Sequence, residues 1–232
     1  MNESLQTAFS GAASSGVALE QRNRVLRNTY WLLALSLVPT VLGAWVGVST
    51  GIMNTMGVGL SAVVFLGGAF GFIFAIEKTK ESSTGVVVLL AFTFFMGLML
   101  SRLLAAILGF RNGPSLIMTA FGGTAGVFFA MATLATVIKR DLSGMGKFLF
   151  IGAVMLLIAG IMNIFLQSSA LMLTLSVIAI GLFSAFMLYD IKRVIDGGET
   201  NYISATLAIY LDIYNVFQSL LVLLGFAGGE RE

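Results

Sequence analysis

Residues 187–203, Met187-Leu-Tyr-Asp-Ile-Lys-Arg-Val-Ile-Asp-Gly-Gly-Glu-Thr-Asn-Tyr-Ile, join the last two long apolar segments of the chain. The apolar segments on both sides, about residues 170–190 and 205–226, have the length of roughly 20 residues that a helix needs to cross a bilayer. Charged residues crowd the short connection between them, and two carboxylates, Asp190 and Asp212, interrupt the apolar segments themselves. This stretch therefore predicts two membrane helices joined by a short loop.

The rest of the chain repeats this pattern. It has 232 residues, of which 58% are hydrophobic and 10% charged, whereas a soluble domain is about half apolar and a quarter charged. We therefore predict an all-α integral membrane protein with a flexible cytoplasmic tail over residues 1–28 and a seven-helix domain over 29–228. The predicted spans are 30–49, 57–76, 86–108, 115–138, 148–167, 170–190 and 205–226.

Cysteine and histidine are both absent. Disulfides, thiolate or imidazole metal sites and Ser-His-Asp or Cys-His catalysis are thereby excluded. We expect a protein that is not an enzyme and has no cofactor. The net charge of +2 is small and the basic residues lie in short loops, so the expected contact is the lipid bilayer and not nucleic acid.

Basic residues are distributed unequally between the two sides. Ten of the thirteen Lys and Arg residues fall on the side of the N-terminus, which predicts a cytoplasmic N-terminus and a C-terminus on the outer, periplasmic side. The ten are Arg22, Arg24, Arg27, Lys78, Lys80, Lys139, Arg140, Lys147, Lys192 and Arg193. Arg111 and Arg231 fall on the other side, and Arg102 lies within a span.

Asp190 and Asp212 are the principal site candidates. A carboxylate in hydrocarbon is costly unless it is paired, protonated or hydrated. Asp190 ends the sixth span on the cytoplasmic side and Asp212 lies five to seven residues into the seventh, so the two can meet and share a proton. The alternative for Asp190 is solvation beside Lys192 and Arg193, and the alternative for Asp212 is a purely structural role.

Other polar residues within the spans could line an ion path or the bundle interior. Asp212, Asn215 and Ser219 follow the i, i+3, i+7 spacing of one helix face. Asn163 and Gln167 form a smaller polar face near the outer side of the fifth span. Hydrogen bonding between helices is the favoured explanation for this second pair, and conduction is the alternative.

Arg102 lies near the outer end of the third span. Its default interpretation is a side chain that reaches the outer headgroups, and the alternative is a counter-charge inside the bundle. The small-residue spacings Gly67…Gly71 and Gly122…Gly126 predict close helix packing, within one chain in preference to a dimer.

Several stretches resemble the bacterial YccA group of the Bax inhibitor (transmembrane Bax inhibitor motif) family. The most specific is 197–206, Gly-Gly-Glu-Thr-Asn-Tyr-Ile-Ser-Ala-Thr, followed by 210–221, Tyr-Leu-Asp-Ile-Tyr-Asn-Val-Phe-Gln-Ser-Leu-Leu, and the likeness extends from about residue 25 to 228. The resemblance implies six helices around the last one and a pH-dependent calcium or proton leak gated near a paired-aspartate site. Asp190 and Asp212 match those aspartates.

The sequence departs from this family pattern in its second span. Family members with the aspartate pair have an arginine at the end of the second helix that bonds the pair in the closed state, and a glutamate within that helix is linked to the ion path. Residues 57–76 contain neither, and Glu77 lies close to the expected arginine position. Arg102 stands where the group more often has proline.

The leading hypothesis is a pH-gated leak for calcium, other cations or protons in the inner membrane. Asp190 and Asp212 would be the sensor and gate, and also the obvious intramembrane oxygen ligands for calcium. The resemblance also suggests the alternative of a non-conducting modulator of the membrane protease FtsH, acting in membrane-protein quality control through the N-terminal tail. An intramembrane aspartyl protease fits less well, because no Gly-x-Gly-Asp surrounds Asp212. A small-solute transporter remains a further alternative.

Overall fold

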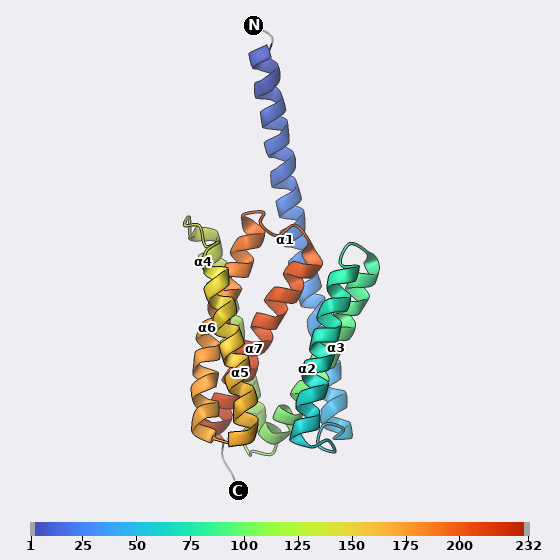
Figure 1. Cartoon of the computed structure of the whole chain (residues 1–232), viewed down its shortest axis with the longest axis vertical. Coiled ribbons are helices and arrows are strands. Elements are labelled where there is room, and N and C mark those ends of the chain that lie inside the picture. Colours follow the sequence, from blue (N-terminus) through green and yellow to red (C-terminus); the bar gives the residue numbers. More distant parts are fainter. Residues whose placement is uncertain (1–2, 230–232) are drawn as a thin grey trace.

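The chain folds into a bundle of long helices. The computed structural model describes the backbone of residues 3–229 and the side chains of residues 20–229, and within that range it contains helices and no strand (Figure 1). All seven helices are long and apolar enough to cross a membrane, which confirms the predicted number of spans. They are α1 Glu3–Thr50, α2 Val58–Thr79, α3 Ser83–Leu108, α4 Gly113–Val137, α5 Met145–Leu166, α6 Ser169–Ile195 and α7 Tyr202–Gly228.

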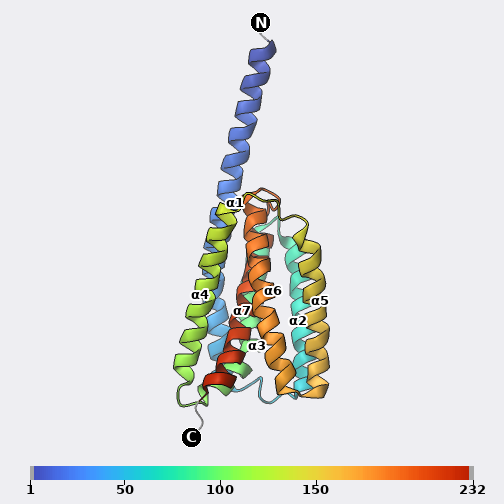
Figure 2. The ribbon, with the colours of Figure 1, turned by 90° about the vertical axis from the view of Figure 1, so that its left-hand side faces the viewer.

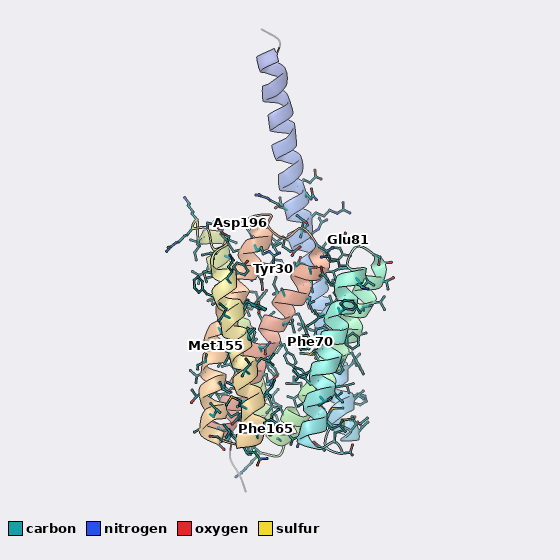
Figure 3. All side chains as sticks on the ribbon, viewed as in Figure 1. Tyr30, Phe70, Glu81, Met155, Phe165 and Asp196 are labelled. Carbon is teal, nitrogen blue, oxygen red and sulfur yellow. The ribbon has the colours of Figure 1, made fainter. Side chains whose placement is uncertain are left out.

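The connections α2–α3, α4–α5 and α6–α7 lie at the end of the bundle from which α1 projects, and the C-terminal end of α7 lies at the other (Figure 1). We call the first the basic end, because Lys80, Arg140 and Arg193 lie in or beside these connections. Charged residues such as Asp196 and Glu81 lie at the basic end in Figure 3.

The body of the bundle is apolar on its outer surface. Phe70, Met155 and Phe165 lie along it in Figure 3, and their side chains are 62%, 65% and 83% exposed. Such a belt is costly in water and favourable in hydrocarbon, so it is the lipid-facing surface of a multi-pass membrane protein.

The N-terminal segment, expected to be a flexible tail, is helical in the described residues. Its backbone from Glu3 onward is helical and continues without a break into the first span, so α1 stands out from the bundle as one rod (Figures 1 and 2). No proline precedes Pro39, and Gly11 and Gly16 are the only glycines before it. Nothing in this segment therefore forces the helix to end before the span begins.

Helix α7 is the central helix. It packs against α1, α2, α3, α4 and α6, whereas α5 packs on the outside of α6. Figure 2 shows α7 running between α4 and α6. Ile209, Val216 and Leu221 of α7 are completely buried. The expected arrangement of helices around the last one is confirmed, with α5 as a more peripheral member.

The closest helix pair is α1 with α3, where glycine allows the two backbones to touch. A Cβ on Gly97 of α3 would lie 2.9 Å from the backbone nitrogen of Ala44, and a Cβ on Gly43 of α1 would lie 3.0 Å from the carbonyl carbon of Phe94. Beside this crossing, Thr40 Oγ1 and the hydroxyl of Tyr210 on α7 share a hydrogen bond of 2.9 Å. Helix α1 is thereby fixed to both α3 and α7.

The other small-residue spacings do not serve packing within the chain. A Cβ added at Gly67, Gly71, Gly122 or Gly126 would meet nothing within 4 Å. The expectation of intrachain packing at these glycines is therefore wrong: the helix faces that carry them point away from the neighbouring helices.

Candidate functional site

The two aspartates meet near the basic end of the bundle. Helix α6 carries Asp190 five residues before its last residue, Ile195, and α7 carries Asp212 ten residues after its first, Tyr202. Because these helices run in opposite directions and pack side by side, their carboxyl groups come within hydrogen-bonding reach of each other. Two carboxyl groups can form a hydrogen bond only when one of them carries a proton.

Asp212 is the more enclosed of the two. It is only 4% exposed. Its Oδ2 is buried, and no N–H or O–H group in the described part of the chain donates to it. A charged carboxylate in this position would be strongly destabilising. The Asp190 carboxyl is therefore the principal polar neighbour of this buried group.

A cavity of about 380 Å³ opens beside Asp190 at the basic end. Its wall is formed by α2, α6, α7 and the loop between the last two, and it includes both charged and apolar side chains. The lining residues are Glu77, Lys80, Asp190, Arg193, Val194, Glu199, Ser204, Ala205, Leu207, Ala208 and Leu211. Asp190 is therefore reachable from the basic end, whereas Asp212 lies behind the wall.

The other charges of this wall are already paired. Lys80 bonds Glu77, and Arg193 Nη2 lies 3.2 Å from Glu199 Oε2. The hydrogen bond to Glu77 raises the pKa of Lys80 above its ordinary value. Among the carboxylates of the wall, Asp190 alone has no Lys or Arg within 4 Å in the described residues. A cation that enters the cavity would meet the Asp190 carboxyl, whose close polar neighbour is Asp212 and not a Lys or Arg side chain.

The loop between α6 and α7 is held by local hydrogen bonds. Asn201 caps α7 by accepting from the backbone N–H groups of Ile203 and Ser204, at 2.9 and 3.1 Å. Its side-chain nitrogen donates to the carbonyl oxygen of Lys80 at 2.9 Å. One residue therefore fixes the start of α7 to the end of α2, across the mouth of the cavity.

The predicted polar stripe on α7, Asp212, Asn215 and Ser219, does not form one connected group. Ser219 is buried, at 8% exposure. The side chain of Asn215 is half-buried and donates to the backbone oxygen of Leu211 on its own helix, at 2.8 Å. Neither residue joins the Asp190–Asp212 contact.

The other polar candidates lie away from the aspartates. Asn163 and Gln167 lie at the α5–α6 turn, at the end opposite the aspartates: Asn163 Oδ1 accepts from the Ser168 N–H at 3.1 Å, and Gln167 ends α5 with φ 48°. Both residues therefore take part in the turn that joins α5 to α6. Arg102 is exposed and lies in the half of α3 away from the basic end. It is therefore not a counter-charge for the aspartates.

Sequence reasoning missed Glu199 and Ser204 as parts of the site. Both belong to the Gly-Gly-Glu-Thr-Asn-Tyr-Ile-Ser stretch, whose mixed polar composition directly before a span was the available signal. Within the described residues no three acidic side chains gather as a metal site would require. Calcium prefers six to eight oxygen ligands, so Asp190 and Asp212 alone would supply only part of a coordination shell.

Comparisons with known proteins identify the family of the chain. The family model described as "Inhibitor of apoptosis-promoting Bax1" matches residues 22–229. The "Modulator of FtsH protease YccA" of Escherichia coli K12 is 39% identical over 213 residues, which cover 92% of this chain and 94% of that protein. An uncharacterized membrane protein of Vibrio cholerae is 39% identical over 209 residues, 88% of this chain and 90% of its own. Since the match covers nearly every helix, the chain belongs to the Bax inhibitor family and is similar to its YccA members.

Proposed function

We propose that this protein is a pH-sensitive leak for cations, calcium or protons, in the bacterial inner membrane, gated by Asp190 and Asp212. The observation that supports this proposal most directly is the contact between two membrane-embedded carboxyl groups, one of which lines a cavity open to the basic end. No enzymatic step is needed for this role. The relative from another Escherichia coli strain is named an inner membrane protein, which favours the same membrane here.

Proton binding would control the gate through the α6–α7 contact. With one proton, the two carboxyls hold each other and α6 stays against α7. With no proton, two negative carboxylates would face each other out of water and repel. With two protons, Asp190 would lose the charge that attracts Arg193, which would weaken the hold on α6. Glu77, Lys80 and Glu199 face the same cavity and modulate its potential. Loosening of this contact would let water and a cation pass beside α7.

The distribution of charge favours an orientation for this path. The end with Lys80, Arg140 and Arg193 is the one that the positive-inside rule assigns to the cytoplasm. The cavity beside Asp190 would then face the cytoplasm, and the C-terminus the periplasm. The gate would respond to cytoplasmic pH.

Ion flux into proteoliposomes between about pH 5 and pH 8, the range in which cellular pH switches operate, tests the proposal. The parent should show a calcium flux that changes with pH, and Asp190→Asn and Asp212→Asn should remove this pH dependence. Asp196→Asn is the matched control, because Asp196 is also an acid at the basic end but is paired with Lys192 at 2.7 Å. An unchanged pH profile in Asp212→Asn would refute the gate.

A second function is favoured by a different observation. YccA is named as a modulator of the FtsH protease, and α1 of this chain extends beyond the bundle where another protein can reach it (Figure 1). In this alternative the protein does not conduct, and the projecting helix binds FtsH. Deleting residues 2–20 should then abolish regulation of the protease while the seven-helix bundle remains folded, whereas a leak should persist.

A further inference from the structure

One strip of α7 remains uncovered although α7 is the central helix. The strip consists of Ser204, Ala208, Leu211, Asn215 and Gln218, which are spaced alternately four and three residues apart and so form one line along the helix. The first four are half-buried and Gln218 is exposed. The first three line the cavity beside Asp190. The strip therefore begins at that cavity and runs along α7 toward the opposite end of the bundle.

The neighbouring helices explain why this strip is open. Helix α2 lies on one side of it and α6 on the other, and α5 packs on α6 and not over α7. Figure 1 shows α7 between α5 and α2 accordingly. In contrast, Tyr210, Val216 and Leu221 on other faces of α7 are at most 2% exposed.

The chemistry of the strip does not suit contact with lipid. Gln218 lies ten residues before Gly228, the end of α7, which places it about 15 Å from the nearer end of the helix. Its side chain is too short to reach the headgroups. No hydrogen bond to its carboxamide is formed within the described residues. An unsatisfied carboxamide in hydrocarbon is costly.

A second unsatisfied group lies at the upper part of the same strip. The hydroxyl oxygen of Ser204 is buried and has no hydrogen-bond partner in the described residues. It lies on the wall of the cavity. Water in the cavity would satisfy Ser204, and water along the strip would satisfy Gln218.

We propose that the strip Ser204–Ala208–Leu211–Asn215–Gln218 is the wall of a water-filled crevice that leads from the Asp190 cavity past the middle of the membrane. The crevice is the route by which a hydrated cation approaches from the basic end, and in that respect it rests on the proposed leak. Leu211 and the side-chain amides of Asn215 and Gln218 line it in turn. Asp212, on the neighbouring face of α7, stays behind the wall.

The chain has no cysteine, so one introduced thiol is the only reactive one. We would introduce Leu211→Cys, Asn215→Cys and Gln218→Cys separately, in the full chain in proteoliposomes, and treat each with a membrane-impermeant methanethiosulfonate cation. The thiolate is the reactive form and needs water to ionise. Modification of these three variants should be at least about tenfold faster than that of a lipid-facing control.

Ile178→Cys is that control, and it is matched in depth. Ile178 is 51% exposed and lies nine residues after the start of α6, which is about 14 Å from the same end of the bundle. Val216→Cys provides the buried control, since Val216 is 0% exposed. Rapid modification of Gln218→Cys with slow modification of Ile178→Cys and Val216→Cys would support the crevice. If Gln218→Cys reacts as slowly as these two controls, the crevice is overturned.

The outcome is separate from that of the leak itself. Modification of the strip in protein that passes no cation supports the crevice and refutes the leak, whereas a leak without modification overturns the crevice and leaves the leak to another route. Gln218→Leu adds a measurement that does not depend on a thiol. In a water-filled crevice this substitution should lower the flux severalfold in a protein of unchanged size-exclusion profile, and a flux equal to the parent's would count against the route.

Discussion

The crossing of α1 and α3 gives a sharp prediction, because Gly97→Ala would add a methyl group where two backbones touch. The new Cβ would lie 2.9 Å from both the nitrogen of Ala44 and the carbonyl carbon of Thr40, closer than nonbonded carbon atoms pack. Both neighbours are backbone atoms of one helix, so the helices must separate. Overpacking of this kind costs about 1–3 kcal/mol. We expect a value in the upper half of this range, because the atoms in contact belong to the backbone and cannot rotate away as a side chain would.

The opposing effect is small and can be measured in the same protein. Replacing a helical glycine by alanine gains up to about 1 kcal/mol of helix propensity. Gly67→Ala is the matched control for this gain, because a Cβ at exposed Gly67 in α2 would meet nothing within 4 Å. The net expectation is a loss of about 1–2 kcal/mol for Gly97→Ala and a gain of about 0.5–1 kcal/mol for Gly67→Ala.

Thermal unfolding in detergent, followed by far-ultraviolet circular dichroism at one scan rate, is the assay. At about 2–4 °C per kcal/mol for a chain of this size, Gly97→Ala should unfold about 2–8 °C below the parent and Gly67→Ala slightly above it. If Gly97→Ala unfolds at or above the temperature of Gly67→Ala, the close approach of α1 and α3 is not present in solution.

Three further predictions concern the connections at the basic end. Asn201→Ala removes the cap of α7 and the bond to Lys80, and it should lower stability by about 1–2 kcal/mol and speed amide exchange in the first turn of α7. Gly197 has φ 79°, so Gly197→Ala should cost about 1–2 kcal/mol in thermal unfolding, whereas Gly198→Ala, without a positive φ, should cost less. Hydrogen bonds from the backbone and side chain of Ser143 lower the pKa of Asp141; the stabilisation is present above the ordinary carboxyl pKa and is lost as pH falls through the lowered value. In an NMR titration, Ser143→Ala should move this pKa part of the way back.

The number and positions of the helices could be predicted because apolar length alone identifies a membrane span. The predicted spans agree with the observed helices to within a few residues at most ends, and the boundaries at Ser168 and Asn201 coincide with capping side chains. The meeting of Asp190 and Asp212 could be predicted as well. Consecutive helices joined by a short loop must be antiparallel neighbours, so residues at similar depths lie close together.

The errors arose where the sequence shows a helix face but not what covers it. The spacing of Asp212, Asn215 and Ser219 indicated one polar stripe. The Asp212 carboxyl instead contacts Asp190 of α6, and the Asn215 side chain donates to the backbone oxygen of Leu211 on its own helix. Asn163 and Gln167 indicated a polar face of the fifth span. Asn163, in the last turn of α5, instead accepts from the Ser168 N–H, and Gln167 follows the helix in a left-handed conformation. Which neighbour meets a given face is decided by tertiary packing.

The unbroken course of α1 has a mechanical consequence. A helix of 48 residues is about 72 Å long, and its N-terminal part stands clear of the bundle (Figure 1). Its inner part is tied to α7 through the hydrogen bond of Thr40 with Tyr210 and through Thr206 Oγ1, which donates to the backbone oxygen of Thr29 at 3.3 Å. A force on the free end of α1 would therefore reach α7, the helix that carries Asp212, through the contact of Thr206 with Thr29, which lies before Pro39 in the chain.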